Sequence, residues 1–130
     1  MAFSALLDKQ ILKHVFQNIP YQSPTQLFVG LYVGDPESGG VEFDAASYVR
    51  YISIFTINIT GEEASNATPI DWNIQGADPV VTITHIAVFD ALVGGNLLAS
   101  GLLANPIVSS SRDQVQLEVG GMKISMGACP

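Results

Sequence analysis

The stretch "THIAVFDALVGGNLLASG", residues 84–101, carries the pattern that decides the fold. Its side chains first alternate between two faces, as in a β-strand, and a glycine pair then precedes a second apolar run. The pattern predicts a strand over 80–91, a glycine turn, and a partner strand over 97–110. Pro106 cannot donate a ladder hydrogen bond, so the second strand is expected to be bent or divided there.

Similar strand patterns lie on both sides of this stretch, separated by segments rich in glycine, proline and polar residues. Strands are predicted over 26–33, 48–59 and 70–74, loops over 34–40 and 60–69, and a hairpin-like pair over 112–127. Short strands without alternating helices are typical of sandwiches rather than of βαβ folds. The sequence therefore predicts a mainly β protein, an antiparallel β-sandwich or jelly-roll-like domain.

The chain begins with a different periodicity. Apolar residues recur every three or four positions over residues 3–19, which predicts one N-terminal amphipathic helix. Ser4 is a suitable N-cap, and Pro20 is expected to end the helix. We expect one domain, 1–130, made of a helix over 1–20 and a sandwich over 24–127.

The function of this helix is open at this stage. Its apolar face either packs on the chain's own sheet or reaches a neighbouring subunit. For the second case, Leu7, Ile11 and Val15 are the predicted centre of the interface.

Composition excludes several partners. Acidic residues outnumber basic ones by 12 to 5, and the formal net charge is −7. Nucleic acid and anionic membranes require clustered Lys and Arg, so neither is an expected partner. No run of apolar residues approaches the length of a transmembrane helix, and the first residues do not follow the signal-peptide pattern. Only 13% of residues are charged and 48% are hydrophobic. Either other protein copies cover part of the surface, or the core strands alone account for this composition.

His85 and Asp90 are the first candidates for catalysis. In a strand, residues five positions apart face opposite sides and lie roughly 17 Å apart, so these two cannot form a dyad. We expect His85 to be buried and hydrogen-bonded. We expect Asp90 to begin the turn by accepting backbone hydrogen bonds.

Other residue types give no stronger signal for chemistry. Asp35, Glu37, Glu42 and Asp44 do not have calcium-loop spacing, and His14 has no partner at metal-ligand spacing. Glu62, Glu63 and Asp71 are formal glycosidase candidates whose separation the sequence does not define. No nucleophile elbow or phosphate loop is present, and Cys129 is a lone cysteine. The sequence therefore predicts no enzyme activity, no cofactor and no metal.

Five blocks, taken in order, indicate a family. They are "LFVGLYVGDPESGG", "SYVRYISIF", "ASNATPIDW", "VTITHIAVFDALVGGNLLASGLL" and "DQVQLEVGGMKISM". Together they resemble a family of small virion proteins from tailed bacteriophages, over roughly residues 5–126. The block from Thr84 to Leu98 is the most specific. Gly34 and the Ala46–Ser47 pair depart from the family pattern without affecting the expected fold.

The resemblance implies a non-enzymatic structural protein of the virion, made in the host cytoplasm. Our first hypothesis is a capsid decoration (cement) protein that bridges major capsid subunits and forms a homo-oligomer such as a trimer. The alternative is a tail, baseplate or fibre-attachment component. A third hypothesis, a carbohydrate-binding β-sandwich, would use Trp72, Tyr48 and Tyr51 as stacking residues, although Trp72 is expected in the core.

Overall fold

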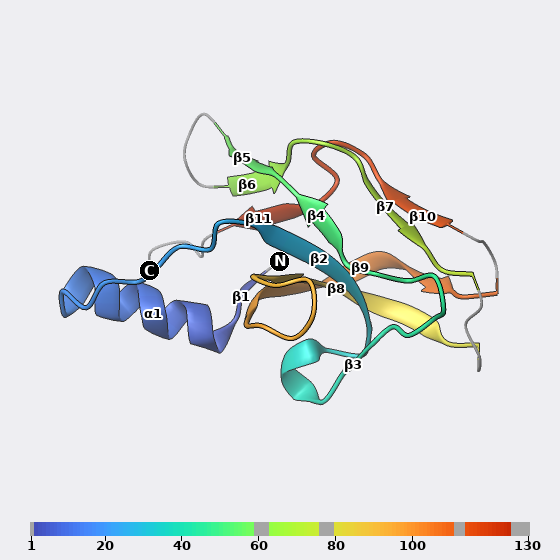
Figure 1. Ribbon diagram of the computed structural model, residues 1–130, viewed down its shortest axis with the longest axis horizontal. Helices are drawn as coiled ribbons and strands as arrows, with labels where there is room; N and C mark the ends of the chain where they lie inside the picture. The colour runs from blue at the N-terminus through green and yellow to red at the C-terminus, as the bar shows by residue number, and fades with distance from the viewer. Residues whose placement is uncertain (1, 59–62, 76–79, 111–113, 126–130) are drawn as a thin grey trace.

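The computed structural model describes residues 2–58, 63–75, 80–110 and 114–125 (Figure 1). In chain order the elements are β1 (Ala2–Phe3), α1 (Ala5–Phe16), β2 (Leu27–Val33), the 3₁₀ helix η1 (Pro36–Ser38), β3 (Val41–Glu42), β4 (Tyr51–Ser53), β5 (Phe55–Ile57), β6 (Glu63–Asn66), β7 (Ile70–Asn73), β8 (Thr82–Phe89), β9 (Leu97–Val108), β10 (Gln114–Leu117) and β11 (Lys123–Ser125). The predicted fold class is confirmed: the chain is mainly β, with antiparallel sheets and an N-terminal helix.

The largest sheet has six strands in the order β1-β9-β8-β2-β3, and β4 also pairs with β2. The predicted strand–turn–strand unit of the opening stretch forms its centre, because β8 pairs with β9 on one side and with β2 on the other. β9 is one bent strand. Leu102 pairs with His85 but Ile107 pairs with Ile83, so the intervening part of β9, which includes Pro106, bulges out of register.

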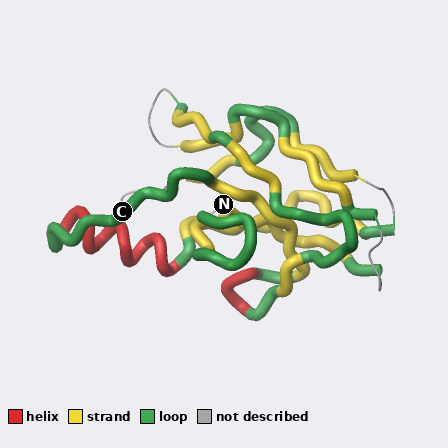
Figure 2. Tube along the Cα trace, in the orientation of Figure 1, coloured by secondary structure: helices red, strands yellow, loops and turns green. Residues whose placement is uncertain are grey.

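Two smaller sheets complete the sandwich in the part of the chain that the structure describes. β10 pairs with β7, and β11, β6 and β5 form the other sheet in that order (Figure 2). The core joins Val29, Leu31, Ile86 and Val88 of the large sheet to Ile70, Trp72, Val115 and Met122 of the opposing segments. The buried Trp72 also donates from Nε1 to the Val29 carbonyl at 2.9 Å, which satisfies its polar atom inside the core.

The region predicted as one long strand over 48–59 forms two strands in different sheets. β4 pairs with β2, whereas β5 pairs with β6. The change of sheet occurs at Ile54, whose carbonyl accepts a hydrogen bond from the Ala67 N–H at 2.8 Å. Both strands mix aromatic, β-branched and hydroxyl side chains in one continuous run, so the local pattern has no mark where the chain changes sheets.

Part of the predicted loop over 60–69 is also a strand, β6. Its polar residues gain their conformation from pairing with β5 and β11, and such tertiary pairing overrides weak strand propensity. Residues 59–62 lie outside the described part of the chain.

The predicted hairpin over 112–127 is wrong. β10 and β11 do not pair with each other but with β7 and β6. The buried Asn66 holds the connection: its Nδ2 donates to the Glu118 carbonyl at 2.8 Å, and its Oδ1 accepts from the Met122 N–H at 2.9 Å. Gly120, with φ +77°, makes the turn, so the glycine signal marks a change of sheet. Residues 111–113 and 126–130 are outside the described ranges.

Candidate interaction surfaces

α1 begins where the sequence predicts. The Ser4 hydroxyl accepts a hydrogen bond from the Leu7 N–H at 3.1 Å, which confirms the N-cap. The Ser4 N–H donates to the Leu98 carbonyl at 2.7 Å, and Oε1 of Glu37 accepts from the Ala5 N–H at 3.0 Å. The first turn is therefore fastened to β9 and η1, and an acidic side chain lies at the positive end of the helix dipole.

α1 ends four residues before Pro20, earlier than predicted. The N–H groups of Gln17 and Ile19 both donate to the Lys13 carbonyl, and Asn18 takes the left-handed conformation with φ +55°. Asn tolerates this conformation better than most residues, so a local C-terminal motif ends the helix. The segment that follows α1 is held to the helix by one further hydrogen bond. The Tyr21 N–H donates to Nδ1 of His14 at 3.1 Å.

Beyond its first turn, α1 extends away from the sheets (Figure 1). None of its residues is buried. Leu12 is 56% exposed and Phe16 is 78% exposed, and both line a shallow groove with Ala5, Lys9 and Lys13. This apolar groove, whose lining also includes Asp8 and Gln17, is the first candidate surface.

The predicted interface stripe divides between two environments. Leu7 and Ile11 are half-buried, whereas Val15 is 61% exposed. Phe16, the most exposed large apolar side chain of the helix, and Leu12, which is 56% exposed, lie outside the predicted stripe. The assignment of Leu7, Ile11 and Val15 to an interface stays a prediction.

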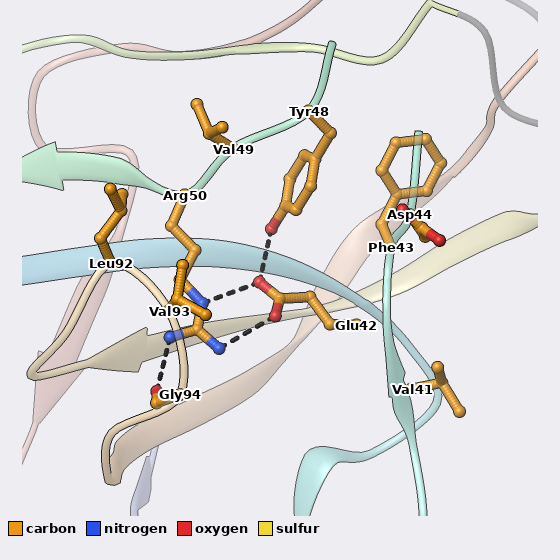
Figure 3. Close-up of a pocket in the computed structure, with 10 residues that line it drawn as sticks. All are labelled: Val41, Glu42, Phe43, Asp44, Tyr48, Val49, Arg50, Leu92, Val93 and Gly94. Atoms are coloured by element: carbon orange, nitrogen blue, oxygen red, sulfur yellow. Dashed lines mark hydrogen bonds and ion pairs between the residues drawn. The ribbon is translucent and has the colours of Figure 1, made fainter. Parts of the chain in front are cut away.

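The second candidate surface surrounds Arg50, a buried residue just before β4 (Figure 3). Its Nε donates to Oε2 of Glu42 at 2.8 Å, and its Nη2 donates to Oε1 at 2.9 Å. Nη1 donates to the carbonyls of Ala91 and Gly94, and Cζ lies 3.6 Å from the Phe89 ring centroid. One guanidinium therefore joins β3, the start of β4 and the turn after β8.

The Tyr48 hydroxyl completes this cluster. It donates to Oε2 of Glu42 at 2.9 Å and accepts from the Leu31 N–H at 2.9 Å. Burial raises the pKa of Tyr48 far above its ordinary value, and this outweighs the lowering effect of the bond from Leu31. Tyr48 is therefore a neutral hydrogen-bond donor at physiological pH.

Large aliphatic side chains project around the cluster. Val41, Val49, Leu92 and Val93 are all exposed, Val93 to 86%. Together with Glu42, Phe43, Asp44, Tyr48, Arg50 and Gly94 they line an open hollow, which we call the Arg50 hollow (Figure 3). A polar floor that is already satisfied, surrounded by exposed apolar groups, suits protein contact better than catalysis.

The two residues considered for a catalytic dyad have separate partners. Asp90 begins the turn, as predicted: its two carboxylate oxygens accept from the backbone N–H and the side-chain amide of Asn96, at 2.7 and 3.0 Å. The backbone bond is the main cause that lowers the pKa of Asp90. His85 is hydrogen-bonded to Thr84, with Nδ1 and Oγ1 2.8 Å apart, but it is half-buried rather than buried.

The acidic candidates are dispersed among structural contacts. Asp35 accepts from the Glu37 N–H at the start of η1, and Glu42 binds Arg50. Glu63 lies on β6 and Asp71 on β7, in different sheets, while Glu62 is outside the described ranges. Within the described residues, no group of three or more His, Cys, Asp or Glu side chains could hold a metal ion. Cys129 also lies outside those residues.

The aromatic residues proposed for sugar stacking are already engaged in the fold. Trp72 is 2% exposed, which confirms its expected place in the core. The Tyr48 ring packs edge-on against Phe43, and the half-buried Tyr51 packs against the core cluster. Trp72 is therefore not accessible to a sugar, and stacking by Tyr48 or Tyr51 stays a prediction. In the described residues, no helix is long and apolar enough to cross a membrane.

The chain matches a known protein family over almost its whole length. Residues 2–125 match the family model described as podophage GP4 fiber I protein gp80. The chain belongs to this family. The resemblance to structural proteins of tailed-phage virions is thereby confirmed, and a fibre family suggests a non-enzymatic protein that associates with other virion proteins. No curated protein matches the chain.

In this member of the GP4 fiber I family, blocks that are far apart in the sequence meet at the Arg50 hollow. Tyr48 and Arg50 come from the "SYVR" block, and Phe89, Ala91 and Gly94 come from the "FDALVGG" block. Sequence reasoning missed the ion pair, because Glu42 was grouped with the neighbouring acids. The available signal was an arginine within the apolar and aromatic run "YVRYISIF", since a charge in a buried strand requires a partner.

Proposed function

We propose that this chain is a structural component of the phage tail, in a fibre or in its attachment, and that it works by binding other virion proteins. The fibre family supports this alternative over the capsid decoration that we placed first from the sequence. The capsid surface stays the competing location. The protein acts as a connector, without a catalytic step.

The exposed groove of α1 is the observation that carries this proposal. A helix that displays Leu12 and Phe16 to water forgoes the stabilisation that burial of apolar surface provides. A structural contact would recover it, because laying the apolar face of a helix against another protein is a common mode of recognition. Fastening at the first turn leaves the rest of α1 available to such a partner.

The location can be tested in intact virions. Particles that carry the chain with a small fused tag, and untagged particles, are reconstructed and their density is compared. The difference density is expected at the tail. Density over the capsid lattice would overturn the proposal and support decoration.

The role of α1 is tested in the same particles. Phages that depend on plasmid-supplied protein are grown with Leu12→Asp/Phe16→Asp or with the control Leu102→Asp, which changes an exposed residue of β9. We expect the double variant to be absent from virions and the control to be incorporated. Equal incorporation of both would show that the groove does not hold the protein in the particle.

A further inference from the structure

We propose that α1 of one copy binds the Arg50 hollow of a second copy of the same chain. This inference rests on the proposed structural function and adds a specific partner. The two candidate surfaces then form one contact. Leu12 and Phe16 bind from the groove of α1, and Val49 and Val93 bind from the Arg50 hollow.

The chain's own α1 does not occupy its own hollow. The first turn is held by the Leu98 carbonyl and Glu37, and the helix then runs away from β3 and β4, which adjoin the hollow (Figure 1). A rigid helix of 12 residues extends about 18 Å from that attachment. Its far end therefore lies away from the chain's own sheets.

The apolar groups of the two surfaces correspond. The groove of α1 presents Leu12 and Phe16, both largely exposed, and the hollow presents Val49, Leu92 and Val93 around a satisfied polar floor. Because Arg50 and Glu42 already satisfy each other, a helix that covers them leaves no unpaired charge behind. Burial of the aliphatic rim supplies the affinity.

Charge supports a second copy as the occupant. Residues 1–20 contain two of the five basic residues and one of the twelve acidic ones, so the rest of the chain has eleven acidic and three basic residues. Lys9, Lys13 and Asp8 line the groove, and the exposed Asp44 lines the hollow. The first 20 residues therefore have a formal net charge of +1 (2 − 1), and the rest of the chain has −8 (3 − 11). An arm of positive net charge is complementary to the acidic body of a second copy.

The contact joins two different surfaces, so each copy donates one helix and receives one. Such a head-to-tail contact closes into a ring if the rotation between copies allows it, and otherwise propagates as a chain. The purified protein is therefore expected to form a concentration-dependent oligomer.

The experiment uses full-length protein and measures mass by light scattering over a dilution series. Phe16→Asp changes the arm, Val93→Asp changes the hollow, and Leu102→Asp is a matched control on β9, outside both surfaces. Each of the first two variants is expected to weaken association at least tenfold, and the control is expected to behave as wild type. All three should keep the wild-type circular dichroism and Tm, because each altered side chain is mostly exposed.

Mixing the two defective variants gives the decisive measurement. Phe16→Asp protein keeps an intact hollow and Val93→Asp protein keeps an intact arm, so their mixture is expected to form a one-to-one dimer that neither forms alone. A monomeric wild type, or a mixture that stays monomeric, would overturn the inference. Tail density with a monomeric purified protein would leave the proposed function standing and point to another virion protein as the partner of α1. A self-associating protein whose density lies outside the tail would overturn the proposed function and leave the contact between copies standing.

Discussion

The side chain of Arg50 shows how one residue can organise distant parts of this chain. Its guanidinium contacts Glu42, two carbonyls of the turn after β8, and the face of Phe89. Removing the carboxylate would leave a buried cation without a counter-charge, which is the costly way to break an ion pair.

Glu42→Ala tests this at the residue scale. We expect it to lower the free energy of unfolding by about 3 kcal/mol, because Arg50 loses its carboxylate partner. Asp44→Ala, two positions away at an exposed site, is the control and should change it by about 0.5 kcal/mol or less. Urea unfolding of the two variants makes the comparison, and equal values would contradict the assigned role of Glu42.

The raised pKa of Tyr48 makes a second residue-scale prediction. The unfolded chain ionises this phenol near its ordinary pKa of about 10, whereas the folded chain keeps it neutral. The contribution of Tyr48 to stability is therefore fully present below pH 10 and is lost as the pH rises above it. Denaturation followed between pH 8 and 11 should show a steeper alkaline loss in wild type than in Tyr48→Phe, and parallel curves would refute the assignment.

At the scale of elements, α1 and the sheets contribute differently to stability. The buried residues that form the core cluster come from β2, β7, β8, β9 and β10 and from the segments between strands, whereas α1 contributes none among the described residues. The sandwich is therefore expected to keep its fold when the outer face of α1 is altered.

Paired truncations measure that difference. Ile70→Ala empties a fully buried site between the sheets and should cost about 2–5 kcal/mol. Leu12→Ala removes a similar side chain from an exposed helix position and should cost less than about 1 kcal/mol. Unfolding in denaturant at a concentration where the protein is monomeric compares them, and a large loss for Leu12→Ala would show that α1 belongs to the core.

At the scale of the whole molecule, charge is distributed unevenly between the arm and the body. Two of the five basic residues lie in the first 20 positions of a chain with a net charge of −7. At low salt, copies repel one another through their acidic bodies and attract through the basic arm, and both effects are screened over about 10 Å at 0.1 M salt.

The repulsion between bodies and the attraction of the arm can be separated by varying the salt concentration and by exchanging the charges of single residues. We expect Lys13→Glu to weaken self-association most strongly at low salt, because it removes an attraction to the body that includes Asp44. Combining Lys13→Glu with Asp44→Lys should restore part of the lost association. Sedimentation equilibrium at 50 and 500 mM salt tests this, and a double variant no stronger than Lys13→Glu alone would count against that pairing.

The sequence by itself determined the mainly β class, the helix start at Ser4, the Asp90 turn and the central β8–β9 pair. These features depend on local periodicity, capping and turn chemistry, and each of these is determined by residues that lie close together in the sequence. Only the tertiary structure decided that the 48–59 region changes sheets at Ile54, that β10 and β11 have separate partners, and that Glu42 pairs with Arg50. Such pairings join residues far apart in the chain, and their free energy comes from burial and register that no local pattern records. The exposure of Leu12 and Phe16 was decided in the same way, since periodicity identifies an apolar face but not what covers it.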